Sequence, residues 1–121
     1  MKKALRIISI TLLTVLLFLF AGCAPTSVAQ AKNRMENEGY TVTVETLTGS
    51  EAGGFGSVIL LEATKNDDQN CYITAFLFKS TKDARTYKKR VPKSNEGKFV
   101  YKRKGKWVYY AHPKAERAFN S

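Results

Sequence analysis

The first 22 residues divide this chain into a segment with the pattern of an export signal and a remainder that must fold by itself. Lys2, Lys3 and Arg6 precede an apolar run from Ile7 to Phe20. A basic start and a short apolar segment followed by small residues are typical of a secretory signal peptide, and the run is too short to be interpreted first as a membrane-spanning helix. Removal of residues 1–22 from the 121-residue chain leaves 99 residues, which suits one small domain with a single core.

Cys23 follows directly on these small residues. The sequence Phe20-Ala21-Gly22-Cys23 resembles the lipobox of bacterial lipoproteins. This resemblance, which covers only residues 1–23, implies that the Cys23 thiol is diacylated and that the chain is then cut just before it. We therefore expect a signal peptide over 1–22, a lipid-anchored tether over 23–26 and a single domain over 27–121, held at the extracytoplasmic face of the cell membrane.

Charge is distributed unevenly along the chain. The whole sequence carries a formal net charge of +10, and the mature part carries +7 because Lys2, Lys3 and Arg6 leave with the signal. Residues 23–78 contain three basic and seven acidic residues, whereas residues 79–121 contain fourteen basic and three acidic ones. A basic C-terminal half favours an anionic partner, but net charge also simply keeps a protein soluble, so both interpretations stay open.

The chain has two cysteines, Cys23 and Cys71. If Cys23 carries lipid, Cys71 has no partner for a disulfide within the chain, and we expect it to pack as a small apolar residue near the start of a strand. In an unlipidated secreted protein, a disulfide between Cys23 and Cys71 is the alternative.

The N-terminal part of the domain predicts a helix and then a strand. Thr26 or Ser27 as an N-cap, apolar residues at helical spacing and Gly39 as a left-handed stop indicate a helix over 27–38. Alternation of apolar and polar residues then predicts a half-buried strand over 40–48.

A hairpin is expected next. A glycine-rich connection over 49–56 leads to an apolar run over 57–64, and a polar turn over 65–70 separates it from a second apolar run over 71–78. The glycine-rich segment lacks the ending of a phosphate-binding P-loop. Because the run 71–78 is apolar on both of its faces, we expect each side of this strand to be covered.

The C-terminal part predicts a helix, a second hairpin and a short final helix. Ser80 with Asp83 three residues later resembles a capping box, and the helix is expected over 81–91, before Pro92. Pro113 after His112 is expected to open the last helix, with Ala115, Ala118 and Phe119 turned inward.

The register of the second hairpin, over 99–111, follows from Gly105. A type I turn at Arg103-Lys104 with Gly105 in the left-handed conformation pairs Tyr101 with Trp107, Phe99 with Tyr109 and Val100 with Val108. That register places four aromatic residues on one face and Val100, Val108, Lys102 and Lys106 on the other. The whole pattern predicts an α+β fold, with helices packed on a mainly antiparallel sheet of about five strands in the order α-β-β-β-α-β-β-α.

Few residues indicate catalysis. His112 is the single histidine, and its place before Pro113 favours a capping or exposed role. Glu45 and Glu62 are strand carboxylates on an exposed side, where they need no catalytic explanation. Spaced Cys and His ligands and an acidic loop of EF-hand type are both lacking, so we expect no enzyme activity, no metal and no cofactor.

One constellation is enriched in cations and aromatic rings. It combines a basic helix face with the second hairpin, and its candidate polyanion-binding residues are Lys88, Lys89, Arg90, Lys98, Lys102, Arg103, Lys104 and Lys106. Aromatic rings stack and cations neutralise anions, so the segment suits an anionic polymer. The competing interpretation is that the aromatic residues form the core and that the lysines protect a sheet edge.

These observations predict a non-catalytic lipoprotein that contacts anionic envelope material, either lipid or a wall polymer, through its basic surface. The alternative is a protein–protein interaction module of an envelope assembly in which the charge is incidental. Nucleic acid is not expected as a partner outside the cytoplasm. The two hypotheses differ in their dependence on salt, because only polyanion binding falls steeply as salt rises.

Overall fold

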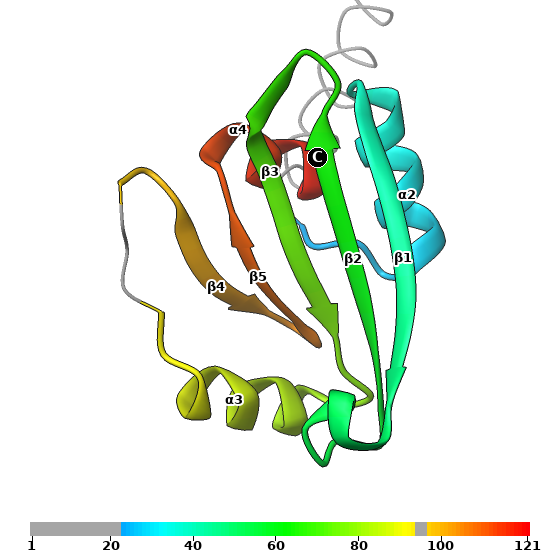
Figure 1. Ribbon diagram of the computed structural model, residues 1–121, viewed down its shortest axis with the longest axis vertical. Coiled ribbons are helices and arrows are strands. Elements are labelled where there is room, and N and C mark those ends of the chain that lie inside the picture. Colours follow the sequence, from blue (N-terminus) through cyan, green and yellow to red (C-terminus); the bar gives the residue numbers. More distant parts are fainter. Residues whose placement is uncertain (1–22, 94–96) are drawn as a thin grey trace, which may run out of the picture.

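Over the described residues, the fold is an α+β arrangement of three α-helices and one five-stranded antiparallel sheet, as the sequence predicts (Figure 1). The computed structural model describes residues 23–93 and 97–121, so the expected signal peptide and Phe20–Gly22 of the lipobox lie outside the described residues. The elements, in chain order, are α2 (Val28–Asn37), β1 (Tyr40–Thr48), a 3₁₀ turn η1 (Gly49–Ala52), β2 (Ser57–Lys65), β3 (Asp68–Leu77), α3 (Thr81–Arg90), β4 (Val100–Lys104), β5 (Trp107–Ala111) and α4 (Pro113–Phe119).

The helix boundaries follow the expected capping residues. The Ser27 hydroxyl accepts from the Gln30 N–H at 3.1 Å to begin α2, and the Ser80 hydroxyl accepts from the Asp83 N–H at 3.1 Å to begin α3. Each hydroxyl satisfies a backbone donor that has no partner within the helix, which is why serine is favoured there. Gly39 has a positive φ of 85°, which ends α2 as expected and turns the chain into β1.

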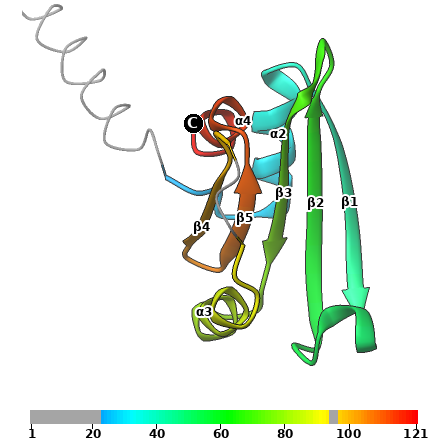
Figure 2. The ribbon, with the colours of Figure 1, turned by 60° about the vertical axis from the view of Figure 1, so that its left-hand side comes forward.

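The strand order is β1-β2-β3-β5-β4, which makes β3 the middle strand and β1 and β4 the two edges (Figures 1 and 2). β3 pairs with β5 although α3 and β4 intervene in the chain, so β4 lies outside β5. The first hairpin has a tighter turn than expected. β2 continues to Lys65 and β3 begins at Asp68, because the polar residues near the turn still pair across the strands, with a shift of register between Thr64 and Lys65.

Helices α2 and α4 cover one face of the sheet and form the main core with it (Figure 2). Met35 of α2, Phe119 of α4 and Tyr109 of β5 are all fully buried there. The segment before α2 is held more closely than a free tether. Pro25 is buried, and its carbonyl accepts a hydrogen bond of 2.8 Å from the Trp107 indole.

The opposite face carries a second, smaller core at one end only. α3 packs against β4 and β5, and its Ala84 and Tyr87 lie with Phe78 and Val108. The expectation that the strand over 71–78 is covered on both sides is therefore met at Phe78, just beyond the end of β3, but not within β3, where Tyr72 and Phe76 stay partly exposed. We call the uncovered part of this sheet surface the open face.

The predicted register of the β4–β5 hairpin is wrong. The strands pair Lys104 with Trp107 and Tyr101 with Tyr110 across a two-residue turn, Gly105-Lys106. Gly105 supplies the positive φ of 59° at the first turn position, which is the arrangement of a type II′ turn and suits the twist of the strands. No residue other than glycine needs a positive φ in the described part of the chain.

The changed register splits the four aromatic residues that were expected on one face. Trp107 and Tyr109 point into the helix-covered core and are buried, whereas Tyr101 lies on the open face. The expected grouping of Val108 with Lys102 is wrong for the same reason. Val108 packs under α3, and Lys102 lies on the helix-covered side of β4 opposite Tyr109.

Candidate functional site

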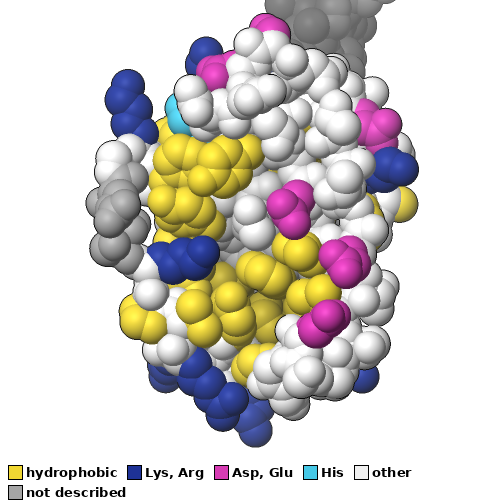
Figure 3. Space-filling model, viewed as in Figure 1, with side chains coloured by type: hydrophobic (Ala, Val, Ile, Leu, Met, Phe, Trp, Pro, Cys, Tyr) yellow, Lys and Arg dark blue, Asp and Glu magenta, His cyan; other side chains and the backbone are white. Residues whose placement is uncertain are grey.

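The open face carries apolar and aromatic side chains of β2, β3, β5 and β4, which form an upper and a lower group with a cation and polar atoms between them (Figure 3). Its residues alternate along the strands with those of the helix-covered core, and each is only partly buried. They are Leu60, Tyr72, Phe76, Tyr101, Tyr110 and, just before β4, Phe99. Partly exposed apolar side chains that gather on one face suit a contact site.

Phe99 is the centre of the aromatic part. Its ring lies 4.8 Å from Tyr72, 5.0 Å from Tyr110 in a stacked arrangement, and 5.7 Å from the edge-on ring of His112, all between centroids. These contacts hold the rings in place, so few side-chain torsions in this cluster rotate freely. A partner that buries them therefore loses little side-chain entropy on binding.

Cations lie over aromatic rings along the α3 and β4 side of the open face. The Lys93 Nζ is 4.9 Å from the centre of the Tyr110 ring, and the Lys88 Nζ is 5.2 Å from the Tyr101 ring. Both rings attract the ammonium group through their negative faces. Tyr101 is also held by a hydrogen bond of 2.7 Å from its hydroxyl to the Val91 carbonyl, and burial raises the pKa of this hydroxyl to about 12.

Carboxylates lie along the other side of the open face, over β1 and β2 (Figure 3). Glu45 pairs with Leu60 across the strands, and Glu62 is two residues from Leu60, so both side chains project from the open face. Glu51 follows in η1, and all three residues are exposed. The open face thus has an acidic margin and a basic margin with apolar surface between them.

The predicted polyanion-binding residues are brought to one side of the molecule but do not form one flat patch. Lys88, Lys89 and Arg90 belong to α3, which packs against β4, and Lys98 precedes that strand. Along β4 the side chains alternate. Arg103 is on the open face, Lys102 and Lys104 are on the opposite side, and Lys106 is exposed in the turn.

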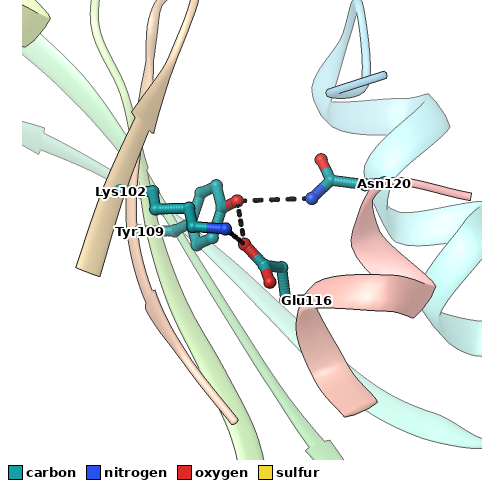
Figure 4. A network of polar contacts seen from close by, with 4 residues as sticks. All are labelled: Lys102, Tyr109, Glu116 and Asn120. Carbon is teal, nitrogen blue, oxygen red and sulfur yellow. Dashed lines mark hydrogen bonds and ion pairs between the residues drawn. The ribbon is translucent and has the colours of Figure 1, made fainter. Parts of the chain in front are cut away.

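Lys102 has a structural partner (Figure 4). Its Nζ is 3.0 Å from Oε2 of Glu116 in α4, and the same oxygen accepts a hydrogen bond of 2.6 Å from the Tyr109 hydroxyl. Asn120 donates to that hydroxyl at 3.3 Å. The network joins the edge strand β4 to α4 across the buried ring of Tyr109, so part of the predicted basic set stabilises the fold.

The network lowers the pKa of the Glu116 carboxyl. Burial opposes ionisation, but the hydrogen bonds from Tyr109 and Lys102 outweigh it and hold the pKa below its usual value of 4.5. A lowered pKa means that ionised Glu116 stabilises the folded state above that value and that this stabilisation is lost as the pH falls through the pKa of the folded protein.

We expect Glu116→Gln to lower the free energy of unfolding by about 1–2 kcal/mol at pH 7, because charge-assisted hydrogen bonds contribute about that much. As the pH falls through the pKa of the folded protein, the difference between the variant and the parent should decrease. Urea unfolding over a pH series downward from pH 7 measures this difference. A difference that does not change with pH would contradict the role of the ionised carboxylate.

A pocket of about 350 Å³ opens at the α3 end of the open face. It is mainly apolar and is lined by Leu47, Leu60, Phe76, Phe78 and Tyr87, with Glu51 at its rim. A second pocket of about 260 Å³ lies near α4 and is polar, with Lys65, Lys114 and Arg117 among its residues. The apolar pocket is continuous with the open face, because Leu60 and Phe76 belong to both.

His112 and Cys71 lie close together, and both side chains have structural roles. The His112 Nδ1 accepts from the Lys114 N–H at 3.2 Å, so the expected capping role is confirmed. Cys71 is a fully buried free thiol, 3.7 Å from that nitrogen and 3.3 Å from the Tyr40 hydroxyl. It therefore packs within β3 as expected, and the alternative disulfide with Cys23 is not formed.

Within residues 23–93 and 97–121, no group of three His, Cys, Asp or Glu side chains lies close enough together to hold a metal ion. Over the same residues, no helix has the length and apolar content needed to cross a bilayer.

Cys23 begins the described chain on the side of the covered face. It is exposed, and its carbonyl accepts a hydrogen bond of 2.9 Å from Arg34 of α2, which also donates to the Phe119 carbonyl at 3.0 Å. Together with the bond from Trp107 to Pro25, these contacts fix the segment before α2 between α2 and α4. The open face lies on the other side of the sheet.

Comparison with known proteins gave no matching family model, no matching curated protein and no matching solved structure. The function is therefore inferred from the residues and geometry above.

The sequence indicated cations and aromatic rings in the second hairpin but did not indicate that Lys93, Tyr72 and Phe76 share a surface with them. Tyr72 and Phe76 could have been found, because β3 is apolar on both faces and three short helices cannot cover a five-stranded sheet twice. No sequence pattern indicated Lys93, because it lies in the connection beyond α3 and its position over Tyr110 depends on the register of β5.

Proposed function

We propose that this chain is a membrane-anchored extracytoplasmic bacterial lipoprotein, without catalytic activity, whose basic C-terminal surface contacts anionic envelope material. The observation that supports this proposal best is the packing of α3 against β4 and β5. It gathers the cations of the helix and of the second hairpin on one side of the domain. On the face drawn in Figure 3, carboxylates lie instead over β1 and β2, where Glu45 and Glu62 are exposed.

The best candidates for this contact are exposed cations that are not held in ion pairs that stabilise the fold. Lys89 on α3, Lys98 before β4 and Lys106 in the turn are all exposed. Lys102 contributes less, because its ammonium group is already held by Glu116. Several such cations acting together attract an anionic surface more strongly than any one of them, and the attraction falls as salt rises.

Binding of the full chain to anionic and neutral liposomes and to polyphosphate, over a salt series, tests the proposal. The double variant Lys89→Glu with Lys106→Glu should weaken polyanion binding by about tenfold or more, because each exposed contact contributes up to about 1 kcal/mol and reversal adds repulsion. Binding by the unchanged chain should fall as salt rises.

A matched control separates local charge from net charge. Lys32→Glu with Lys114→Glu changes the net charge by the same amount at exposed positions on α2 and α4. Equal losses in both double variants, or binding that ignores salt, would contradict a localised basic surface. Salt-independent binding would favour the alternative function, a protein-interaction module.

A further inference from the structure

We propose that β1 pairs edge to edge with β1 of a second copy of this chain, so that the two sheets join into one antiparallel sheet. The two-fold axis of this dimer is perpendicular to the sheet and lies level with Val44. This pairing is separate from polyanion contact, because β1 carries no lysine or arginine and lies at the edge of the sheet opposite to β4 (Figure 1). It also leaves the open face and α3 outside the interface.

The two edges of the sheet differ in their protection. β4 has five residues, three of them basic, and α3 packs against it. A short strand, basic side chains and a covering helix are devices that prevent an edge strand from pairing with another chain. β1 has nine residues, with no proline and Glu45 as its one charge, and its register with β2 is unbroken. The edge at β1 can therefore accept another strand.

The backbone groups of β1 alternate between β2 and the free edge. The Gly39 carbonyl accepts from the Asn66 N–H at 3.0 Å, across the first hairpin pair. Because a trans peptide directs its C=O and N–H to opposite sides, the Tyr40 N–H points away from β2, and every second residue along the strand repeats this direction. The outward-facing residues are therefore Tyr40, Val42, Val44, Thr46 and Thr48. Over residues 23–93 and 97–121, no backbone group of a helix or loop is bonded to the inner three of them.

These outward groups and the side chains select one register. An axis at Val44, the middle residue of β1, pairs the whole strand with its copy, and its inner residues alone supply about six new hydrogen bonds. Glu45 of each copy then lies opposite Thr43 of the other. An axis at Glu45 would instead place two carboxylates opposite each other, which costs free energy. An axis farther from the middle would pair fewer residues.

The same register buries the most exposed apolar side chain of β1. Val44 is 44% exposed, and it is the large apolar side chain that the described part of the fold leaves exposed. It lies on the helix-covered side of β1, beyond Tyr40 and Val42, which pack into the main core with α2. Opposite its own copy, Val44 gains an apolar neighbour at the centre of the interface.

α2 leaves room for the second strand. It lies behind the sheet and runs alongside the first half of β1 (Figures 1 and 2). The two-fold axis reverses the direction of the second copy, so the second α2 lies alongside the other half of the interface. The two helices therefore do not occupy the same place.

The orientation suits two copies at one membrane. Rotation about an axis perpendicular to the sheet keeps the helix-covered faces of both copies on the same side, and Cys23 lies on that side, bonded to Arg34 of α2. If Cys23 carries lipid as proposed above, one membrane holds both copies and raises their effective concentration. A single pair of strands is a small interface, so we expect a weak, reversible dimer. The strand pairing itself requires neither the lipid nor a polyanion.

Disulfide cross-linking of the full chain in proteoliposomes tests the register. Thr43 and Glu45 of opposite copies form a non-hydrogen-bonded pair, whose Cα atoms lie about 4.5 Å apart, within the range for a disulfide. On mild oxidation, a mixture of differently tagged Thr43→Cys and Glu45→Cys chains should form a mixed disulfide about fivefold more than either variant forms with itself. A self-linked product as abundant as the mixed one, or no product above that of the unchanged chain, would overturn the proposal.

A charge exchange at Val44 in these two cysteine backgrounds tests the two-fold axis. Val44→Lys in both chains places two ammonium groups opposite each other and should reduce the mixed disulfide about fivefold. Gln69→Lys adds the same charge at an exposed position of β3 and should leave the yield unchanged. Val44→Lys in one chain with Val44→Glu in the other restores an opposite pair and should restore the product. A yield that stays low in this last mixture would refute the axis at Val44.

Discussion

Trp107→Ala should remove about 3–5 kcal/mol from the free energy of unfolding, the usual cost of deleting a buried large aromatic side chain. Trp107 is 2% exposed, and its ring meets Phe119 edge-on at 5.0 Å between centroids. Its indole N–H also donates to the Pro25 carbonyl at 2.8 Å. A domain of this size has about 5–15 kcal/mol of stability in all, so the variant should be close to unfolding.

Trp107→Phe separates packing from hydrogen bonding. It keeps an aromatic ring against Phe119 but removes the donor to Pro25, and we expect a loss of about 1–2 kcal/mol. Urea unfolding followed by circular dichroism suits both variants, since Trp107 is the single tryptophan and fluorescence is lost with it. A cost below about 1 kcal/mol for Trp107→Ala would contradict its place as a link between β5, α4 and the segment before α2.

The helices were predictable from sequence because their signals are local. Ser27 and Ser80 cap a helix wherever their neighbours allow one, and Pro113 begins a helix for the same reason. These effects depend on contacts three or four residues apart, which the sequence shows directly. The fold class was predictable because it follows from the order of the helices and strands along the chain.

The predicted register of the second hairpin was wrong because the register depends on the type of one turn. A type I turn before Gly105 and a type II′ turn beginning at Gly105 use the same glycine, but they differ in register by an odd number of residues. An odd shift moves every side chain to the other face. The core packing of Trp107 and Tyr109 against Phe119 favours the second turn, and that packing involves a helix that the hairpin sequence does not contain.

Only part of the candidate site could be predicted from the sequence, for a related reason. Basic residues in 79–121 are evident from composition, but composition does not show that Glu116 holds Lys102 or that Lys93 lies over Tyr110. Both contacts join segments that meet only after the sheet has formed.

Cys23→Ser should abolish fatty-acid labelling of the chain and leave the signal segment uncleaved. The resemblance of residues 20–23 to a lipobox assigns acylation to the Cys23 thiol, and a hydroxyl does not replace the thiol in that modification. Two acyl chains hold a protein stably at a bilayer, whereas a single myristoyl-type chain binds only marginally, so the variant should also lose anchoring by lipid.

Cys71→Ser is the matched control, because Cys71 is the other cysteine of the chain and is fully buried in β3. It should keep its label and its processing, although its core packing is altered. Metabolic labelling with a fatty acid and a gel shift on cleavage measure both outcomes. Label retained in Cys23→Ser would exclude this anchor.

In the proposed lipoprotein the anchor would be short. Because Pro25 is buried and bonded to Trp107, only one or two residues would separate a lipid on Cys23 from the folded domain. At about 3.5 Å per residue, the domain would be held within roughly 10 Å of the headgroups. The proposed basic surface would then meet anionic lipid or nearby polymer at high effective concentration, which compensates for weak individual contacts. The fragment Ala24–Ser121, which lacks both the signal segment and the proposed lipid, should therefore bind anionic liposomes far more weakly than the lipidated chain.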